Sequence, residues 1–229
     1  VVGDVNPKRI RELAEIYFGR LPSGPKPEPL RTVEPPQQGE RRVALRLQSQ
    51  RFIVMGYHKP DINHPDNAVY EAIGNLLSQG RSSRLYRALV RDKKVATQVG
   101  GMPGFPGQKY PSLFVFFGLT APRKTNDDVE KALDAEIERL KNELVSPEEL
   151  DGVKRRARAN LLRQMSNNFV LAIQLSNYQA LTGDWRNLFR QVEKINAVTP
   201  QDIQRVAKAT FTWNNKSVGT IDPIETAAK

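Results

Sequence analysis

The sequence predicts an α+β domain in which long helices cover one face of a mostly antiparallel sheet of four or five strands. Three observations predict this architecture. Short apolar runs typical of strands are grouped between residues 43 and 120. Longer segments with apolar residues at helical spacing follow after residue 124. One more apolar run, residues 216–221, closes the sheet as a last strand.

The composition is that of an ordinary globular protein. The chain has 229 residues, of which 39% are hydrophobic and 26% are charged. The sequence has no apolar run of the ~20 residues that a membrane span needs. The absence of cysteine excludes a disulfide framework and a cysteine nucleophile, and it fits either a reducing or an oxidising compartment.

The first 19 residues predict a strand followed by a helix. VVGDV, residues 1–5, reads as a buried strand. Asn6 is a typical N-cap, Pro7 suits the first helical position, and Gly19 ends the helix. Residues 20–40 then contain six prolines, which predicts an extended linker and the one clear boundary in the chain.

Two strands, two helices and two further strands are predicted after the linker. The predicted strands are VALRLQ, RFIVMGYH, VATQVGG and SLFVFFGLT, the last of which is apolar at five successive positions and is expected inside the sheet. A helix is predicted from about Asp66 to Ser78, and a glycine turn leads into a short helix before VATQVGG. One or two helices are expected in residues 168–196. Three more helix starts show a cap with an acidic residue nearby: Thr125 with Asp128, Ser146 with Glu149, and Thr199 with Asp202.

The two ends of the chain carry related pieces. A strand-like run precedes a helix in residues 1–19, and a helix precedes a strand-like run at the C-terminal end. We therefore expect residues 1–19 to be the closing strand and helix of a preceding homologous domain. Residues 20–40 are the proline-rich linker, and residues 41–229 form the α+β domain.

The segment GYHKPDINHPD holds both histidines of the chain, which raises the question of a metal site. His58 and His64 are six residues apart and prolines interrupt the interval, so one helix cannot present both to an ion. We expect loop histidines, with Asp66 near the start of the next helix, and no metal site in this chain.

Two other segments have a chemical and a structural interpretation. The net charge of +10 and the run KRRARANLLR invite a nucleic-acid role. Leu150, Val153, Ala157 and Leu161 form an apolar stripe through that run, so its basic residues are expected on a solvated helix face, and no nucleic acid is expected as a partner. QGRSSR lacks the spacing of a phosphate-binding loop, and Ser82 or Ser83 is expected to cap the short helix.

Several ordered motifs resemble insulinase/pitrilysin-type zinc metallopeptidases, which include the mitochondrial processing peptidases. VVGDVNPKRIRELAEIYFGRLPSG resembles the segment that closes their first domain. HPDNAVYEAIGNLLSQGRSSRLYRALVRDKKVATQVGG is similar to a hallmark of their second domain, and SPEELDGVKRRARANLLRQM and VTPQDIQRVAKATF match two of its helices. The resemblance covers nearly the whole chain.

The resemblance implies the second, non-catalytic domain. The catalytic domain of the family carries the inverted zinc motif H-x-x-E-H, which this sequence lacks. The second domain typically supplies an Arg and, seven residues later, a Tyr that reach the substrate. Arg91 matches the Arg, whereas Gln98 stands in place of the Tyr. These two are the expected substrate-binding residues; no catalytic residue is expected.

We therefore expect the non-catalytic half of a zinc metalloendopeptidase, which cradles a peptide substrate opposite a zinc-bearing half. That partner half is on the same chain or a separate subunit, and zinc is the cofactor expected there. The alternative is a structural or recognition module of the same fold without a role in proteolysis. The compartment expected from the resemblance is the bacterial periplasm.

Overall fold

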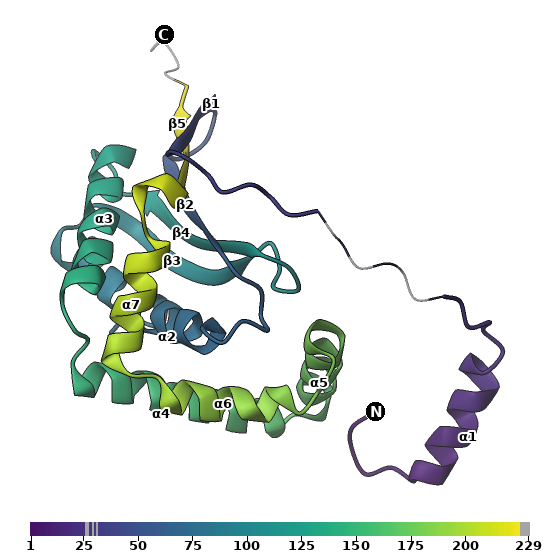
Figure 1. Ribbon diagram of the computed structural model, residues 1–229. Coiled ribbons are helices and arrows are strands. Elements are labelled where there is room, and N and C mark those ends of the chain that lie inside the picture. The colour runs from purple at the N-terminus through teal and green to yellow at the C-terminus, as the bar shows by residue number, and fades with distance from the viewer. Residues whose placement is uncertain (26–27, 29, 31, 225–229) are drawn as a thin grey trace.

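A computed structural model describes residues 1–25, 28, 30 and 32–224. In this part of the chain five strands form one sheet, and seven α-helices, one π-helical segment and one 3₁₀ turn accompany it (Figure 1). The strands are β1 (Arg41–Leu47), β2 (Phe52–Lys59), β3 (Ala96–Phe105), β4 (Ser112–Thr120) and β5 (Lys216–Pro223). The helices are α1 (Pro7–Phe18), α2 (Asn67–Ser78), η1 (Tyr86–Asp92), α3 (Asn126–Asn142), α4 (Pro147–Met165), α5 (Asn168–Thr182), α6 (Asn187–Ala197), α7 (Pro200–Thr210) and η2 (Trp213–Asn215).

The sheet has the order β1-β5-β2-β4-β3. Only the β1–β5 pair is parallel among these strands, and the other three pairs are antiparallel. β4 therefore lies between two strands, as its continuous apolar run predicts. The predicted α+β class and the mostly antiparallel sheet are confirmed.

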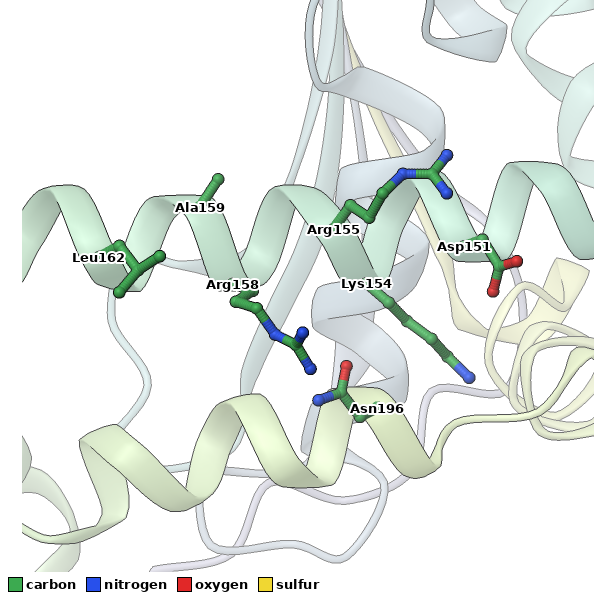
Figure 2. Close-up of a pocket in the computed structure, with 7 residues that line it drawn as sticks. All are labelled: Asp151, Lys154, Arg155, Arg158, Ala159, Leu162 and Asn196. Carbon is green, nitrogen blue, oxygen red and sulfur yellow. The ribbon is translucent and has the colours of Figure 1, made fainter.

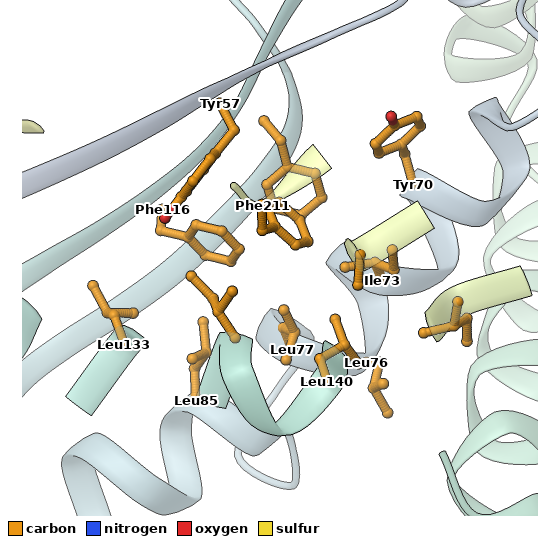
Figure 3. Packing of buried hydrophobic residues seen from close by; sticks show 14 of the residues in the cluster. Tyr57, Tyr70, Ile73, Leu76, Leu77, Leu85, Phe116, Leu133, Leu140 and Phe211 are labelled. Atoms are coloured by element: carbon orange, nitrogen blue, oxygen red, sulfur yellow. The ribbon is translucent and has the colours of Figure 1, made fainter. Parts of the chain in front are cut away.

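Helices cover one face of the sheet (Figure 1). α2, α3 and α7 contact the strands directly, and α4 and α6 form a further layer against α2. The core lies between the sheet and the helices α2, α3 and α7. Phe116, Leu77 and Leu133 are fully buried in it (Figure 3). The ring of Phe211, which follows α7, lies 5.1 Å from that of Tyr57 and 5.5 Å from that of Phe116.

The opposite face of the sheet is open over β1. Val43, Leu45 and Leu47 point to this face and are 62%, 50% and 45% exposed. Because side chains alternate along a strand, the register places Phe117 and Leu119 of β4 on the same side, away from the core.

α1 lies apart from this domain (Figure 1), whereas Gly3, ahead of it, lies against the side chain of Asn168 at the start of α5. α1 forms as predicted, because Asn6 Oδ1 accepts hydrogen bonds from the backbone N–H groups of Lys8 and Arg9 at 3.0 and 3.3 Å. Residues 1–5 form no strand in this structure: the segment pairs with no described strand, and Val1 is 88% exposed. An apolar run forms a strand only where a neighbouring strand takes its backbone hydrogen bonds.

Candidate functional site

Arg91 lies in the π-helical segment η1, whose turns are wider than those of an α-helix. The backbone N–H of Lys93 donates to the carbonyl of Ala88, five residues earlier, at 3.0 Å. Leu85 and Leu89 are fully buried and fix this segment against the core. Arg91 therefore faces outward. Wide turns of this kind occur often at functional sites.

The guanidinium of Arg91 is paired with its neighbour. Its Nε and Nη2 donate to the two carboxylate oxygens of Asp92 at 2.7 and 3.2 Å. These hydrogen bonds raise the pKa of Arg91 and lower the pKa of Asp92. Both side chains are more than half exposed, so water competes with the pair, and other Arg91 N–H groups remain for a ligand.

Gln98 lies near the start of β3, the strand that follows η1. It pairs with Leu119 of β4, and the next residue, Val99, pairs with Gly118 and packs toward the core. Gln98 consequently points to the open face of the sheet and is exposed. No hydrogen bond joins Arg91 to Gln98 in the described part of the chain, although their two elements are in contact.

An ion pair that the sequence did not reveal fixes the turn that precedes η1. The side chain of Arg84 is 2% exposed, and its Nε and Nη2 donate to Glu149 at 2.9 and 2.6 Å. Glu149 also closes the predicted capping box of α4 with Ser146. The hydrogen bond from Arg84 is the main reason why the pKa of Glu149 is lowered. The predicted serine cap of the short helix is wrong, because η1 begins at Tyr86, its N-cap residue is Leu85, and no side chain caps it.

The two histidines have separate partners. The prediction that both histidines lie in a loop is wrong for His58, which lies in β2 with its Nδ1 3.0 Å from Asn215 Oδ1. His64 lies in the following loop, where its Nδ1 accepts from the backbone N–H of Asp66 at 3.1 Å. In residues 1–25, 28, 30 and 32–224 no group of three or more His, Asp or Glu side chains is arranged to hold a metal ion. These side chains do not fit a zinc ion.

A second ion-pair cluster fixes the start of the domain. Lys216 is 7% exposed, and its Nζ donates to Glu130 at 2.8 Å and to Asp134 at 2.9 Å. Arg42 also donates to Glu130, at 3.0 Å. Burial alone would lower the pKa of Lys216, but its hydrogen bonds to the two carboxylates outweigh burial and raise it. The cluster joins β1, β5 and α3, and it is structural.

No helix in the described residues is long and apolar enough to cross a membrane.

The chain is 26% identical over 216 residues to zinc protease PqqE of Helicobacter pylori, a match that covers 92% of this chain and 48% of PqqE. A protease structure from Helicobacter pylori matches with a TM-score of 0.88 and 25% identity, over 97% of this chain and 54% of that one. The chain thus spans about half the length of these relatives.

Two more comparisons bear on the non-catalytic interpretation. The inactive peptidase domain of a Bordetella parapertussis protein assigned as a zinc protease matches with a TM-score of 0.69 and 26% identity, over 81% of this chain and 97% of that one. The sequence model of the family described as the peptidase M16 inactive domain matches residues 1–157, which are more than half of the chain. The chain therefore belongs to the peptidase M16 inactive-domain family.

Proposed function

We propose that this chain is the non-catalytic half of a zinc metalloendopeptidase, which cradles a peptide opposite a zinc-bearing half that carries the H-x-x-E-H motif. Within an inactive-domain family, the observation that supports a role at the substrate is the exposure of Arg91 and Gln98 on two neighbouring elements. The partner half, in the same chain or a separate subunit, would supply the zinc ion that activates water.

Arg91 is the residue that would act on the substrate. A guanidinium is always charged and can donate two parallel hydrogen bonds, which suits a peptide carbonyl on which negative charge develops. Gln98 can donate one hydrogen bond through its amide, a weaker version of the tyrosine hydroxyl that the family typically has there. The Asp92 carboxylate competes for the same guanidinium in the absence of substrate.

The domain boundaries belong to the same proposal. Residues 1–19 would be the closing strand and helix of a preceding homologous domain. Residues 20–40 would be the linker, and residues 41–229 would be the inactive peptidase-like domain. The exposure of α1, which buries none of its residues, supports this division. Residues 26–27, 29 and 31 of the linker and 225–229 of the domain lie outside the described part of the chain.

The second candidate function is a structural or recognition module without a role in proteolysis. Two observations favour it: Gln98 in place of the Tyr, and the engagement of Arg91 by Asp92. The compartment also stays a proposal, the bacterial periplasm. PqqL of Escherichia coli is described as a periplasmic protease and shares the fold with a TM-score of 0.70, but at 16% identity that likeness concerns the fold alone.

The test is peptide cleavage by the chain combined with its zinc-bearing half. Arg91→Ala should lower kcat on the order of 10²–10³-fold, the usual effect of losing one donor to a developing oxyanion. Gln98→Tyr should raise kcat or leave it unchanged. Lys93→Ala is the control, since Lys93 is an exposed cation two residues away that has no ion pair in the described structure.

Asp92→Asn tests whether the Asp92 carboxylate competes with the substrate for Arg91. If Arg91 acts on the carbonyl, release from the Asp92 carboxylate should not reduce kcat. Normal cleavage with Arg91→Ala would show that the domain only encloses the peptide. Failure of every zinc-bearing half to restore cleavage would favour the module without a role in proteolysis.

A further inference from the structure

The helix layer farthest from the sheet contains a groove between α4 and α6. The groove contains an open pocket of about 400 Å³ (Figure 2). Leu150 and Val153, from the predicted apolar stripe of α4, are buried against the domain. Figure 2 shows Lys154 and Arg158 reaching from α4 toward α6, and Asn196 projecting back from α6.

Positively charged side chains outnumber negatively charged ones in this groove. Lys154, Arg155 and Arg158 line it together with a single carboxylate, that of Asp151. None of the three cations forms an ion pair within the described residues. Several other basic side chains of the helical layers do have acidic partners, namely Arg84, Arg87, Lys131, Arg139, Lys141, Arg186, Arg190 and Arg205, whereas Arg156, Arg163, Lys194 and Lys208 form no ion pair within the described residues.

The groove also has an apolar side. Ala159 and Leu162 line it, and Leu162 is 62% exposed. An exposed leucine beside unpaired cations suits a ligand that presents carboxylates and an aliphatic side chain together. The lining contains no aromatic ring on which a nucleic-acid base could stack.

We propose that the α4–α6 groove is a docking site for an acidic, partly apolar segment of a partner protein. Lys154 and Arg158 would donate charge-assisted hydrogen bonds to Asp or Glu carboxylates of the segment, which are stronger than bonds between neutral groups. The Asn196 amide can donate one more, and Leu162 would pack against an apolar residue. The proposal does not rest on a role in proteolysis.

The test measures binding of a short, fluorescently labelled peptide of Glu and Leu to the full chain by fluorescence anisotropy. The double variant Lys154→Glu, Arg158→Glu should weaken binding by about tenfold or more, because two attractive charges become repulsive. Binding by the unmodified chain should also weaken as salt rises, since the contacts are solvent-exposed. Leu162→Ala should weaken binding by a smaller factor.

The matched control changes the same net charge elsewhere. Lys8→Glu, Arg11→Glu places both substitutions on the exposed face of α1, and its affinity should stay within about twofold of the unmodified chain. If the control loses as much affinity as the groove variant, overall charge and not the groove attracts the peptide.

Two other probes can overturn the proposal. Equal binding of a peptide with Gln in place of Glu would show that the groove does not recognise carboxylates. Tighter binding of a single-stranded oligonucleotide, lost in the groove variant, would identify a nucleic-acid surface instead. Thermal unfolding checks that the groove variant is folded; if it is not, Lys154→Gln, Arg158→Gln replaces it, with loss of binding again expected. The assay needs no zinc-bearing half, so its result is independent of the peptidase test.

Discussion

α1 and α7 are helices of similar length with the same local signals and different surroundings. Each has a capping side chain, Asn6 or Thr199, and a proline in the first turn. α7 buries four residues in the domain, whereas α1 buries none. The comparison shows that local sequence is enough to set where a helix starts, while its burial depends on partners elsewhere. We call residues 1–19 the arm and residues 41–224 the body.

The two regions should therefore differ in what stabilises them. An isolated helix of 12 residues is marginal in water, since few hydrogen bonds offset the cost of its first turn. The helices of the body gain from buried apolar surface, about 25 cal/mol for each Å² removed from water. Changes in the arm should leave the unfolding of the body nearly unaffected.

The largest contrast is expected for a large aromatic side chain. Phe116→Ala should lower the free energy of unfolding of the body by about 3–5 kcal/mol, because Phe116 is fully buried among other rings. Phe18→Ala removes the same atoms from the arm, where the side chain is 69% exposed, and should change stability by less than about 0.5 kcal/mol. Urea unfolding followed by circular dichroism measures both. An equal loss for Phe18→Ala would show that arm and body unfold as one unit.

The next contrast compares two ion pairs. Glu149→Gln leaves the buried Arg84 without its carboxylate and should cost about 2–3 kcal/mol at pH 7, below the usual range for buried pairs because Glu149 is a quarter exposed. Glu12→Gln breaks the Arg9–Glu12 pair of the arm, in which both side chains are more than 60% exposed, and should cost almost nothing.

The pH dependence of that difference follows from the lowered pKa of Glu149. A carboxyl whose pKa is lower in the folded than in the unfolded chain contributes stability above its ordinary pKa of about 4.5. That contribution is lost as the pH falls through the pKa of the folded state. The gap between the original chain and Glu149→Gln should therefore be constant near neutral pH and should shrink below about pH 4.5. A gap that widens in acid would show that Arg84 does not stabilise the charged form.

The smallest contrast concerns the two caps. Thr199 Oγ1 accepts a hydrogen bond from the backbone N–H of Asp202 at 3.1 Å, and Thr199→Ala should cost the body about 1 kcal/mol. Asn6→Ala should leave the unfolding of the body unchanged and instead speed amide exchange in residues 7–18. Slower or unchanged exchange there would mean that contacts other than the cap hold α1.

Elements with local signals could be predicted from the sequence, and contacts between distant residues could not. The three capping boxes are present, and SLFVFFGLT lies inside the sheet. VVGDV has the composition of a strand, although a strand also requires a neighbour. The partners of Arg84 and Lys216 are 65 and 86 residues away along the chain, so no local pattern could reveal them.

Arg91 shows the same division for the candidate site. Its position follows from a resemblance to a family, and the buried Leu85 and Leu89 explain its outward direction. The hydrogen bonds to Asp92 depend on side-chain conformation, which the sequence does not specify. The α4–α6 groove was missed because KRRARANLLR shows a basic helix face but not the second helix that faces it.

The parallel pairing of β1 with β5 has a mechanical consequence. β1 comes directly after the linker, and its seven residues, Arg41 to Leu47, are in register with Ser217 to Pro223. Tension applied through the linker would pull β1 along its own axis, so the hydrogen bonds would be loaded in shear and would share the force. The salt bridges of Arg42 and Lys216 to Glu130 lie at the end where the force enters. The junction is therefore built to resist pulling, whereas a sideways force would open it one bond at a time.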